Sequence, residues 1–203
     1  MLKPLLLTVL GCSALIGLSA CGNDAPGRSG KTVSVGTADI GGPFTLVETT
    51  GDVVTEADLL GKPHLVYFGF AYCPDICPTA LQKMGAAQEL LGKQGDEIGY
   101  VLITVDPERD TPESLGQYIT ADVFPKGLRG FTGTVEQIEV AKQAYKVTAM
   151  KADMPGSAAD YTINHSDIMY LMDQDGKFVD YFYGRSTPQD IAVRTRLHLK
   201  SGK

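Results

Sequence analysis

The sequence predicts an α/β fold, and three features indicate it. Residues 65–70 form a continuous apolar run rich in aromatic and β-branched side chains, which is typical of a strand buried on both faces. The apolar residues that follow recur at spacings of four, three, four and three, which predicts one buried face of a helix ending near Gly92. These residues are Cys77, Leu81, Met84, Gln88 and Leu91. A second apolar strand, residues 98–105, comes next, so we expect a right-handed parallel crossover.

A short hairpin is predicted before the central strand. Residues 43–47 alternate between apolar and polar side chains, Thr50-Gly51-Asp52 favours a turn, and residues 53–54 form the returning strand. His64 stands at the start of the central strand. We expect it to be a partly exposed side chain without a ligand role.

Two capping patterns predict the starts of later helices. Asp110 or Thr111 caps a helix that has Pro112 in its first turn. Thr134 and Gln137 are three residues apart and form a capping box at the start of another helix.

The last part of the chain predicts a loop, a hairpin and a helix. Residues 150–159 are expected to form a loop, and residues 168–172 and 177–182 form two strands around the turn 173–176. A final helix begins at Thr187 and Pro188. With the earlier elements, this order predicts a thioredoxin-like three-layer α/β fold that carries an N-terminal hairpin and an extra loop insertion.

The first twenty residues predict an export signal. Lys3 precedes an apolar segment, residues 5–16, that is short for a membrane-spanning helix. The ending Leu18-Ser19-Ala20-Cys21 is similar to a bacterial lipobox, so Cys21 is the expected lipidation site and the first residue of the mature protein. An uncleaved N-terminal anchor is the alternative. We therefore expect a lipid-anchored protein on the periplasmic face of a bacterial membrane.

The chain divides into a signal peptide at 1–20, a flexible tether at 21–34 and a folded domain at 35–203. The tether is rich in Gly, Pro and polar residues and lacks apolar periodicity. Without residues 1–20 the chain keeps 17 basic and 24 acidic residues, a net charge of −7. Nucleic-acid binding usually requires a basic face, so we expect no nucleic-acid partner.

Two of the four cysteines, Cys73 and Cys77, lie on the turn that joins the central strand to its helix. A helix N-terminus favours a thiolate over a thiol. If this turn is helical, residues four apart share a face and their Cβ atoms are about 5–6 Å apart. The two sulfurs can then bind one metal ion or form a disulfide, and His165 is the candidate third residue that separates these outcomes.

Six motifs in a fixed order carry a family resemblance. They are Tyr67-Phe68-Gly69-Phe70, Cys73-Pro74-Asp75-Ile76-Cys77-Pro78, Asp106-Pro107-Glu108-Arg109-Asp110-Thr111, residues 128–134, Ala144-Tyr145-Lys146-Val147, and residues 161–176 around His165. Together they resemble the Sco/SenC family of copper-binding, thioredoxin-like proteins over roughly residues 42–199.

The resemblance implies a copper site in which His165 completes a ligand set with Cys73 and Cys77. Two thiolates and one imidazole suit Cu(I) in three-coordinate geometry, and zinc usually takes a fourth ligand, so copper, as Cu(I) or Cu(II), is the expected metal. The implied function is a metallochaperone that helps to assemble the CuA centre of cytochrome c oxidase. Its expected partners are the copper-receiving oxidase subunit, the membrane through the lipid anchor, and a second periplasmic copper chaperone.

Two other functions remain open for the cysteine pair. Cys73 and Cys77 can act as catalytic residues of a thiol-disulfide oxidoreductase that reduces the cysteines of the oxidase copper site. A permanent structural disulfide is less favoured, because so small a loop stabilises little and His165 would have no role. Asn164 stands where many family members have Asp, which puts in doubt a role for that position in tuning the imidazole.

Overall fold

The structure is a computed structural model, and it describes residues 39–156 and 159–201. Within these residues the fold is built on a mixed seven-stranded sheet. Strands β3, β4 and β5 are parallel, whereas β1 and β8 run antiparallel to their neighbours. The strands in sheet order are β2 (Val53–Thr55), β1 (Thr45–Glu48), β5 (Leu128–Thr132), β4 (Gly99–Thr104), β3 (His64–Gly69), β8 (Ile168–Met172) and β9 (Phe178–Tyr183). The predicted export signal, tether and lipidation site at Cys21 lie outside the described residues.

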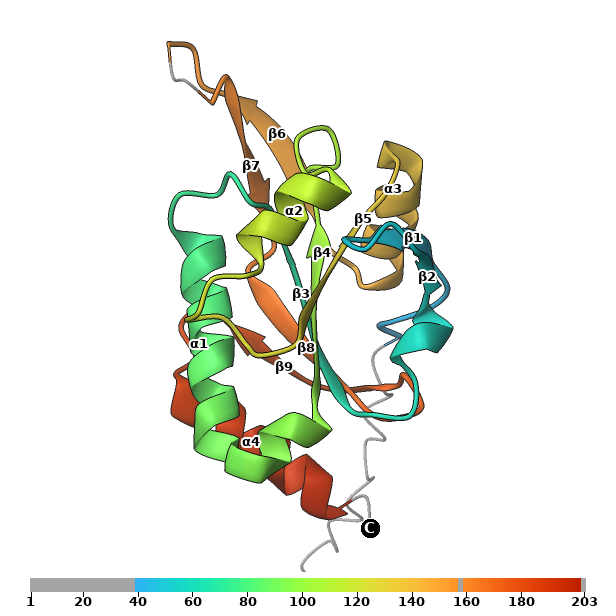
Figure 1. Cartoon of the computed structure of the whole chain (residues 1–203), viewed down its shortest axis with the longest axis vertical. Coiled ribbons are helices and arrows are strands. Elements are labelled where there is room, and N and C mark those ends of the chain that lie inside the picture. The colour runs from blue at the N-terminus through green and yellow to red at the C-terminus, as the bar shows by residue number, and fades with distance from the viewer. Residues whose placement is uncertain (1–38, 157–158, 202–203) are drawn as a thin grey trace, which may run out of the picture. The chain divides into compact units, whose positions relative to one another are not determined.

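Helices cover both faces of the sheet. They are α1 (Ile76–Leu91), α2 (Pro112–Tyr118), α3 (Val135–Ala144) and α4 (Pro188–Ser201), with 3-10 turns at Glu56–Leu59 and Gly92–Glu97. Helix α1 packs against α4, and α3 lies on the other side of the sheet (Figure 1). Gly69 of β3 approaches Cys77 of α1, whereas its neighbour Phe68 packs against Tyr145 at the end of α3 on the opposite face of the sheet, as expected for adjacent strand residues. The predicted three-layer α/β fold is therefore confirmed.

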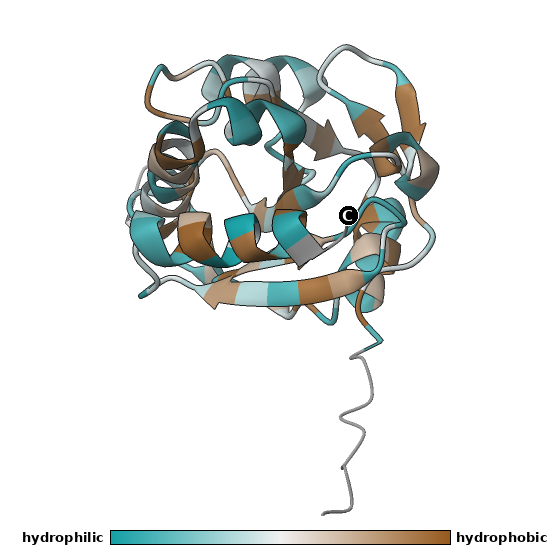
Figure 2. Cartoon of the chain, turned by 90° about the horizontal axis from the view of Figure 1, so that it is seen from below, coloured by the Kyte–Doolittle hydropathy of each residue, from teal (hydrophilic) through white to brown (hydrophobic). Residues whose placement is uncertain are grey.

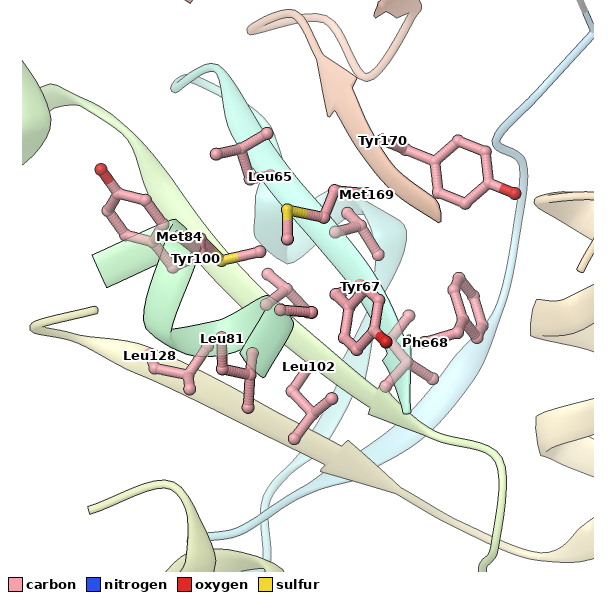
Figure 3. Close-up of a cluster of buried hydrophobic side chains, with 14 of the residues drawn as sticks. Leu65, Tyr67, Phe68, Leu81, Met84, Tyr100, Leu102, Leu128, Met169 and Tyr170 are labelled. Carbon is pink, nitrogen blue, oxygen red and sulfur yellow. The ribbon is translucent and has the colours of Figure 1, made fainter. Parts of the chain in front are cut away.

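The core forms where β3 meets α1. Leu65, Val66, Tyr67 and Phe68 are fully buried, so β3 has the two buried faces that its sequence predicts. Figure 3 shows Leu81 and Met84 of α1 among side chains from β3 and β4. In Figure 2 hydrophobic and hydrophilic positions alternate along the helices, as expected for elements that bury one face. This packing fixes the start of α1 against the end of β3.

The cap predictions hold in detail for two helices. The Thr111 hydroxyl accepts a hydrogen bond from the Ser114 backbone N–H at 3.2 Å, with Pro112 in the first turn. Thr134 and Gln137 form the predicted capping box of α3. Asp110 is not the cap; it is buried and bonds elsewhere, as described below.

The predicted loop insertion is a two-stranded antiparallel ribbon, formed by β6 (Ala149–Asp153) and β7 (Tyr161–His165). The expectation of a loop over residues 150–159 is wrong for residues 150–153. Strand β6 has no alternation of buried and exposed residues, so its sequence carries no strand pattern, and its conformation depends on the hydrogen bonds to β7.

His64 differs from the prediction in its burial. It is only 2 % exposed, and its Nδ1 lies 3.1 Å from the Lys62 carbonyl oxygen. Burial holds the pKa of His64 below its usual value. His64 starts β3, whereas the cysteines follow the other end of that strand. That His64 has no ligand role stays a prediction.

Candidate metal centre

The two cysteines lie at the start of α1. Cys73 precedes the helix, which begins at Ile76, so the segment between the cysteines is only partly helical. The Cys77 backbone N–H donates to the Cys73 sulfur at 3.3 Å, and the side chain of the cap residue Asp75 makes no capping bond. The Cys73 sulfur therefore takes the acceptor role that a capping oxygen usually fills. Both cysteines are free thiols.

A glycine lets the buried cysteine approach the sheet. A Cβ atom added at Gly69 would lie 3.1 Å from the Cys77 sulfur and 2.9 Å from the Tyr67 ring. Cys77 is fully buried against this glycine, while Cys73 is half-buried. One sulfur is thus enclosed and the other faces the surface.

His165 completes the cluster from the last position of β7. Its Nε2 lies 3.3 Å from the Cys77 sulfur, and the ligand atoms of Cys73, Cys77 and His165 all lie within 4.8 Å of one another. Two sulfurs bound to one metal ion at about 2.3 Å lie at most about 4.6 Å apart, so this spacing needs little closure to hold an ion. The structure brings together all three residues that the sequence singled out.

The orientation of the His165 ring is set by its neighbours. Its Nδ1 lies 3.1 Å from the Ser166 carbonyl oxygen, which can only accept, so in the neutral ring Nδ1 carries the proton and Nε2 presents a lone pair to the sulfurs. Tyr67 and Phe70 pack edge-on to the imidazole at 6.1 and 5.9 Å between ring centres. The tautomer with its proton on Nδ1 is the one that a metal bound at Nε2 requires.

The two thiols differ in acidity. The hydrogen bond from the Cys77 thiol is the main cause that lowers the pKa of Cys73 to about 4, with backbone N–H groups of Cys77 and Asp75 adding to it against the opposing effect of burial. The hydrogen bond to Cys73 and its own burial raise the pKa of Cys77. In the metal-free protein Cys73 is therefore the thiolate at neutral pH and Cys77 the thiol.

This difference predicts the pH dependence of alkylation. Between pH 5.5 and 7.5 we expect the rate at which iodoacetamide labels Cys73 to change by less than about twofold, because the thiolate is already formed. An ordinary thiol such as glutathione, with a pKa well above this range, gains about tenfold per pH unit and serves as the internal control. Peptide mass spectrometry measures both rates, and Cys77 should stay unlabelled. A tenfold rise per unit at Cys73 would contradict the assignment.

Several residues that support the site were missed by sequence reasoning. The Tyr67 hydroxyl donates to the Asp167 carboxylate at 3.1 Å and also interacts with the Cys77 side chain, and burial raises the pKa of Tyr67. Asp167 comes two residues after His165, and only this proximity could have indicated it. Phe70 was noted as the end of an apolar run, whereas its position beside the imidazole depends on the tertiary fold.

The donor set favours a soft metal ion. Two sulfurs and one imidazole nitrogen are ligands that bind Cu(I) well, whereas magnesium and calcium require oxygen. Among residues 39–156 and 159–201, no other group of three His, Cys, Asp or Glu side chains converges closely enough to hold a metal ion. A zinc ion would need a fourth ligand, which none of these side chains supplies.

Comparison with known proteins agrees with this geometry. The family model described as SCO1/SenC matches residues 33–200. The chain belongs to the SCO1/SenC family. This SCO1/SenC chain is 39% identical to Protein SenC of Rhodobacter capsulatus over 186 residues, which cover 92% of the chain and 82% of that protein.

Two solved structures extend the similarity to three dimensions. Copper-bound ScoI of Arabidopsis thaliana has a TM-score of 0.75 and 36% identity to this SCO1/SenC chain, and the match covers 80% of the chain and 99% of ScoI. BsSco, a member of the Sco family of cytochrome c oxidase assembly proteins in which a disulfide switch was identified, has a TM-score of 0.64. At 24% identity, covering 82% of the chain and 97% of BsSco, that match shows the shared fold.

Proposed function

We propose that this chain is a copper metallochaperone that binds copper through Cys73, Cys77 and His165 and delivers it to the CuA site of a cytochrome c oxidase. The single observation that carries the proposal is the convergence of two sulfurs and an imidazole nitrogen within 4.8 Å. The half-buried Cys73 faces the surface, so a partner's ligand can reach the metal there first and begin the exchange. The copper-receiving oxidase subunit is the proposed partner. This chain delivers copper to that subunit either directly or together with a second periplasmic copper chaperone.

Substitution of the histidine tests the ligand set. We expect His165→Ala to lower Cu(I) affinity by at least about tenfold, because loss even of an outer partner of a metal ligand costs 10–100-fold. Competition titration against a Cu(I) chelator under anaerobic conditions measures the change. The same variant should still form and break the Cys73–Cys77 disulfide, since neither sulfur is altered.

A second histidine provides the matched control. His198→Ala changes the last turn of α4, away from the cysteines, and should leave Cu(I) affinity unchanged. Equal affinity of His165→Ala and the unmodified protein would reject His165 as a ligand.

A dithiol reductase is the second candidate function, favoured by the acidity of Cys73 and the free state of both thiols. The Cys73 thiolate would attack a disulfide of the oxidase copper site, form a mixed disulfide and release one target sulfur as a thiolate. The Cys77 thiol would then lose its proton to that thiolate and attack the Cys73 sulfur, which forms the Cys73–Cys77 disulfide and releases the second target sulfur, so the target gains two electrons. Reduced, metal-free protein should then reduce a peptide carrying the target disulfide. Failure at a matched redox potential would reject this function.

We also propose that Cys21 carries the lipid anchor on the periplasmic face of a bacterial membrane. Support comes from the sequence Leu18-Ser19-Ala20-Cys21 after an apolar segment. Within the part of the chain that the structure describes, no helix combines the length and hydropathy needed to cross a membrane. Cys21→Ser should move the protein from the membrane fraction to the soluble fraction and abolish labelling with a fatty-acid analogue; retention of the label would contradict the assignment.

A further inference from the structure

The turn after β4 contacts both segments that carry the proposed copper ligands. Residues 106–110 lie between β4 and α2, and they reach the loop that carries the cysteines and the ribbon that carries His165. We propose that Arg109 is a positioning residue that holds the β6–β7 ribbon so that His165 stays within bonding distance of the sulfurs. This inference rests on the proposed copper site and assigns a residue to its construction.

Arg109 is attached to the ribbon at three points. Its Nη1 donates to the carbonyl oxygens of Ala159 and Tyr161, both at 3.0 Å. Its guanidinium carbon lies 3.7 Å from the centre of the Tyr161 ring. The guanidinium both donates hydrogen bonds to the backbone and packs on the Tyr161 ring. These contacts together fix the position and the orientation of the start of β7. Tyr161 begins β7, and His165 ends it.

Arg109 is itself fixed from the sheet side. Its Nε donates to the Asp106 carboxylate at 2.5 Å, and Asp106 is 1 % exposed. The other Asp106 oxygen accepts from the Tyr161 hydroxyl at 2.7 Å. Asp106, Arg109 and Tyr161 therefore each contact the other two. The charge of the buried Asp106 carboxylate is paired with Arg109, and Tyr161 connects both residues to the ribbon.

The same turn holds the cysteine loop through Asp110. Its Oδ2 accepts from the Ala71 backbone N–H at 3.0 Å and from the Thr104 hydroxyl at 2.6 Å. Ala71 lies two residues before Cys73, so Asp110 and Arg109 attach the two ligand-bearing segments to one turn. The distance between sulfur and imidazole is then set by residues that do not contact either.

The ribbon needs such an attachment. Strands β6 and β7 form a separate two-stranded sheet, which projects beyond the end of the main sheet where α1 begins (Figure 1). An isolated two-stranded hairpin is at best marginally stable in water. Ile163 is buried and anchors the middle of β7, while Arg109 anchors its start.

The test is a double-mutant cycle read by Cu(I) affinity. Arg109→Ala should lower the affinity about 10–100-fold, as expected for a residue that orients a ligand. In the His165→Ala background the same substitution should have no further effect, because the histidine through which it acts is absent. An equal loss in both backgrounds would overturn the proposal, since it would show a general structural effect.

Metal-free protein gives an independent readout. Hydrogen exchange of the β7 amides should accelerate in Arg109→Ala, while exchange in β3 stays unchanged; unchanged β7 exchange would also contradict the proposal. Arg129→Ala is the matched control, because Arg129 forms a two-point ion pair with Glu48 at 2.7 and 2.8 Å and lies over Phe131, outside the ribbon. It should alter neither copper affinity nor β7 exchange.

A milder variant, Tyr161→Phe, serves if Arg109→Ala does not fold. Tyr161→Phe keeps the ring under the guanidinium but removes the hydroxyl that bonds to Asp106, so a smaller affinity loss is expected, again confined to the background with His165. If His165→Ala lowers affinity and neither variant does, the positioning role is wrong and the copper site stands. If His165→Ala itself has no effect on Cu(I) affinity, the assignment of His165 as a ligand is wrong, and the positioning role that rests on it is rejected as well.

Discussion

Cys77→Ser should remove high-affinity Cu(I) binding, with a loss of more than about 100-fold. The hydroxyl occupies nearly the same volume, but oxygen is a poor ligand for Cu(I), whereas a thiolate is a strong one. The loss should exceed the 10–100-fold cost of removing an outer partner, because Cys77 is proposed as a direct ligand. Its sulfur lies 3.3 Å from the His165 Nε2, and the described residues hold no third cysteine that could replace it beside Cys73.

Met84 supplies a control on the same helix face. It is another fully buried sulfur-containing residue of α1, seven positions after Cys77. Met84→Leu preserves volume and should keep full copper affinity. Retention of tight Cu(I) binding by Cys77→Ser, in a variant with unchanged circular dichroism, would show that copper is held elsewhere.

Phe68→Ala should cause a large loss of stability. Phe68 is fully buried in the central strand and packs on Tyr145 at 5.3 Å between ring centres. Truncation of a core Phe to Ala lowers the free energy of unfolding by about 3–5 kcal/mol, because contacts are lost and a cavity remains. Urea denaturation followed by circular dichroism measures the change.

The variant also separates stability from metal binding. Phe68 faces α3, whereas its neighbours Tyr67 and Gly69 face the cysteines, so the folded fraction of Phe68→Ala should retain its Cu(I) affinity. Phe178→Ala, at a half-buried position of the edge strand β9, should cost only about 1 kcal/mol. A Phe68→Ala effect no larger than that of Phe178→Ala would contradict the assignment of the core.

Sequence patterns predicted the central strand, α1, both hairpins of the main sheet and the caps at Thr111 and Thr134. Each of these depends on local physics: burial on both faces, helical spacing, or a hydroxyl beside free N–H groups. The convergence of Cys73, Cys77 and His165 was expected from the family resemblance, because a separation of 88 residues between Cys77 and His165 leaves no local signal of contact.

What sequence reasoning missed depends on tertiary contact. Strand β6 lacks apolar alternation, since it is held by its pairing with β7 and by the ion pair between Lys151 and Glu108 rather than by burial of one face. Arg109 donates to the carboxylate of Asp106, three residues earlier in the chain. Its contact with Tyr161 joins residues 52 positions apart.

X-ray absorption at the copper edge, on anaerobically reduced protein loaded with one equivalent of Cu(I), tests the copper site most directly. The unmodified protein should show two sulfur ligands and one imidazole nitrogen, and the nitrogen contribution should disappear in His165→Ala. A spectrum of the unmodified protein that shows no imidazole, or that is identical in the two proteins, would contradict the proposed site.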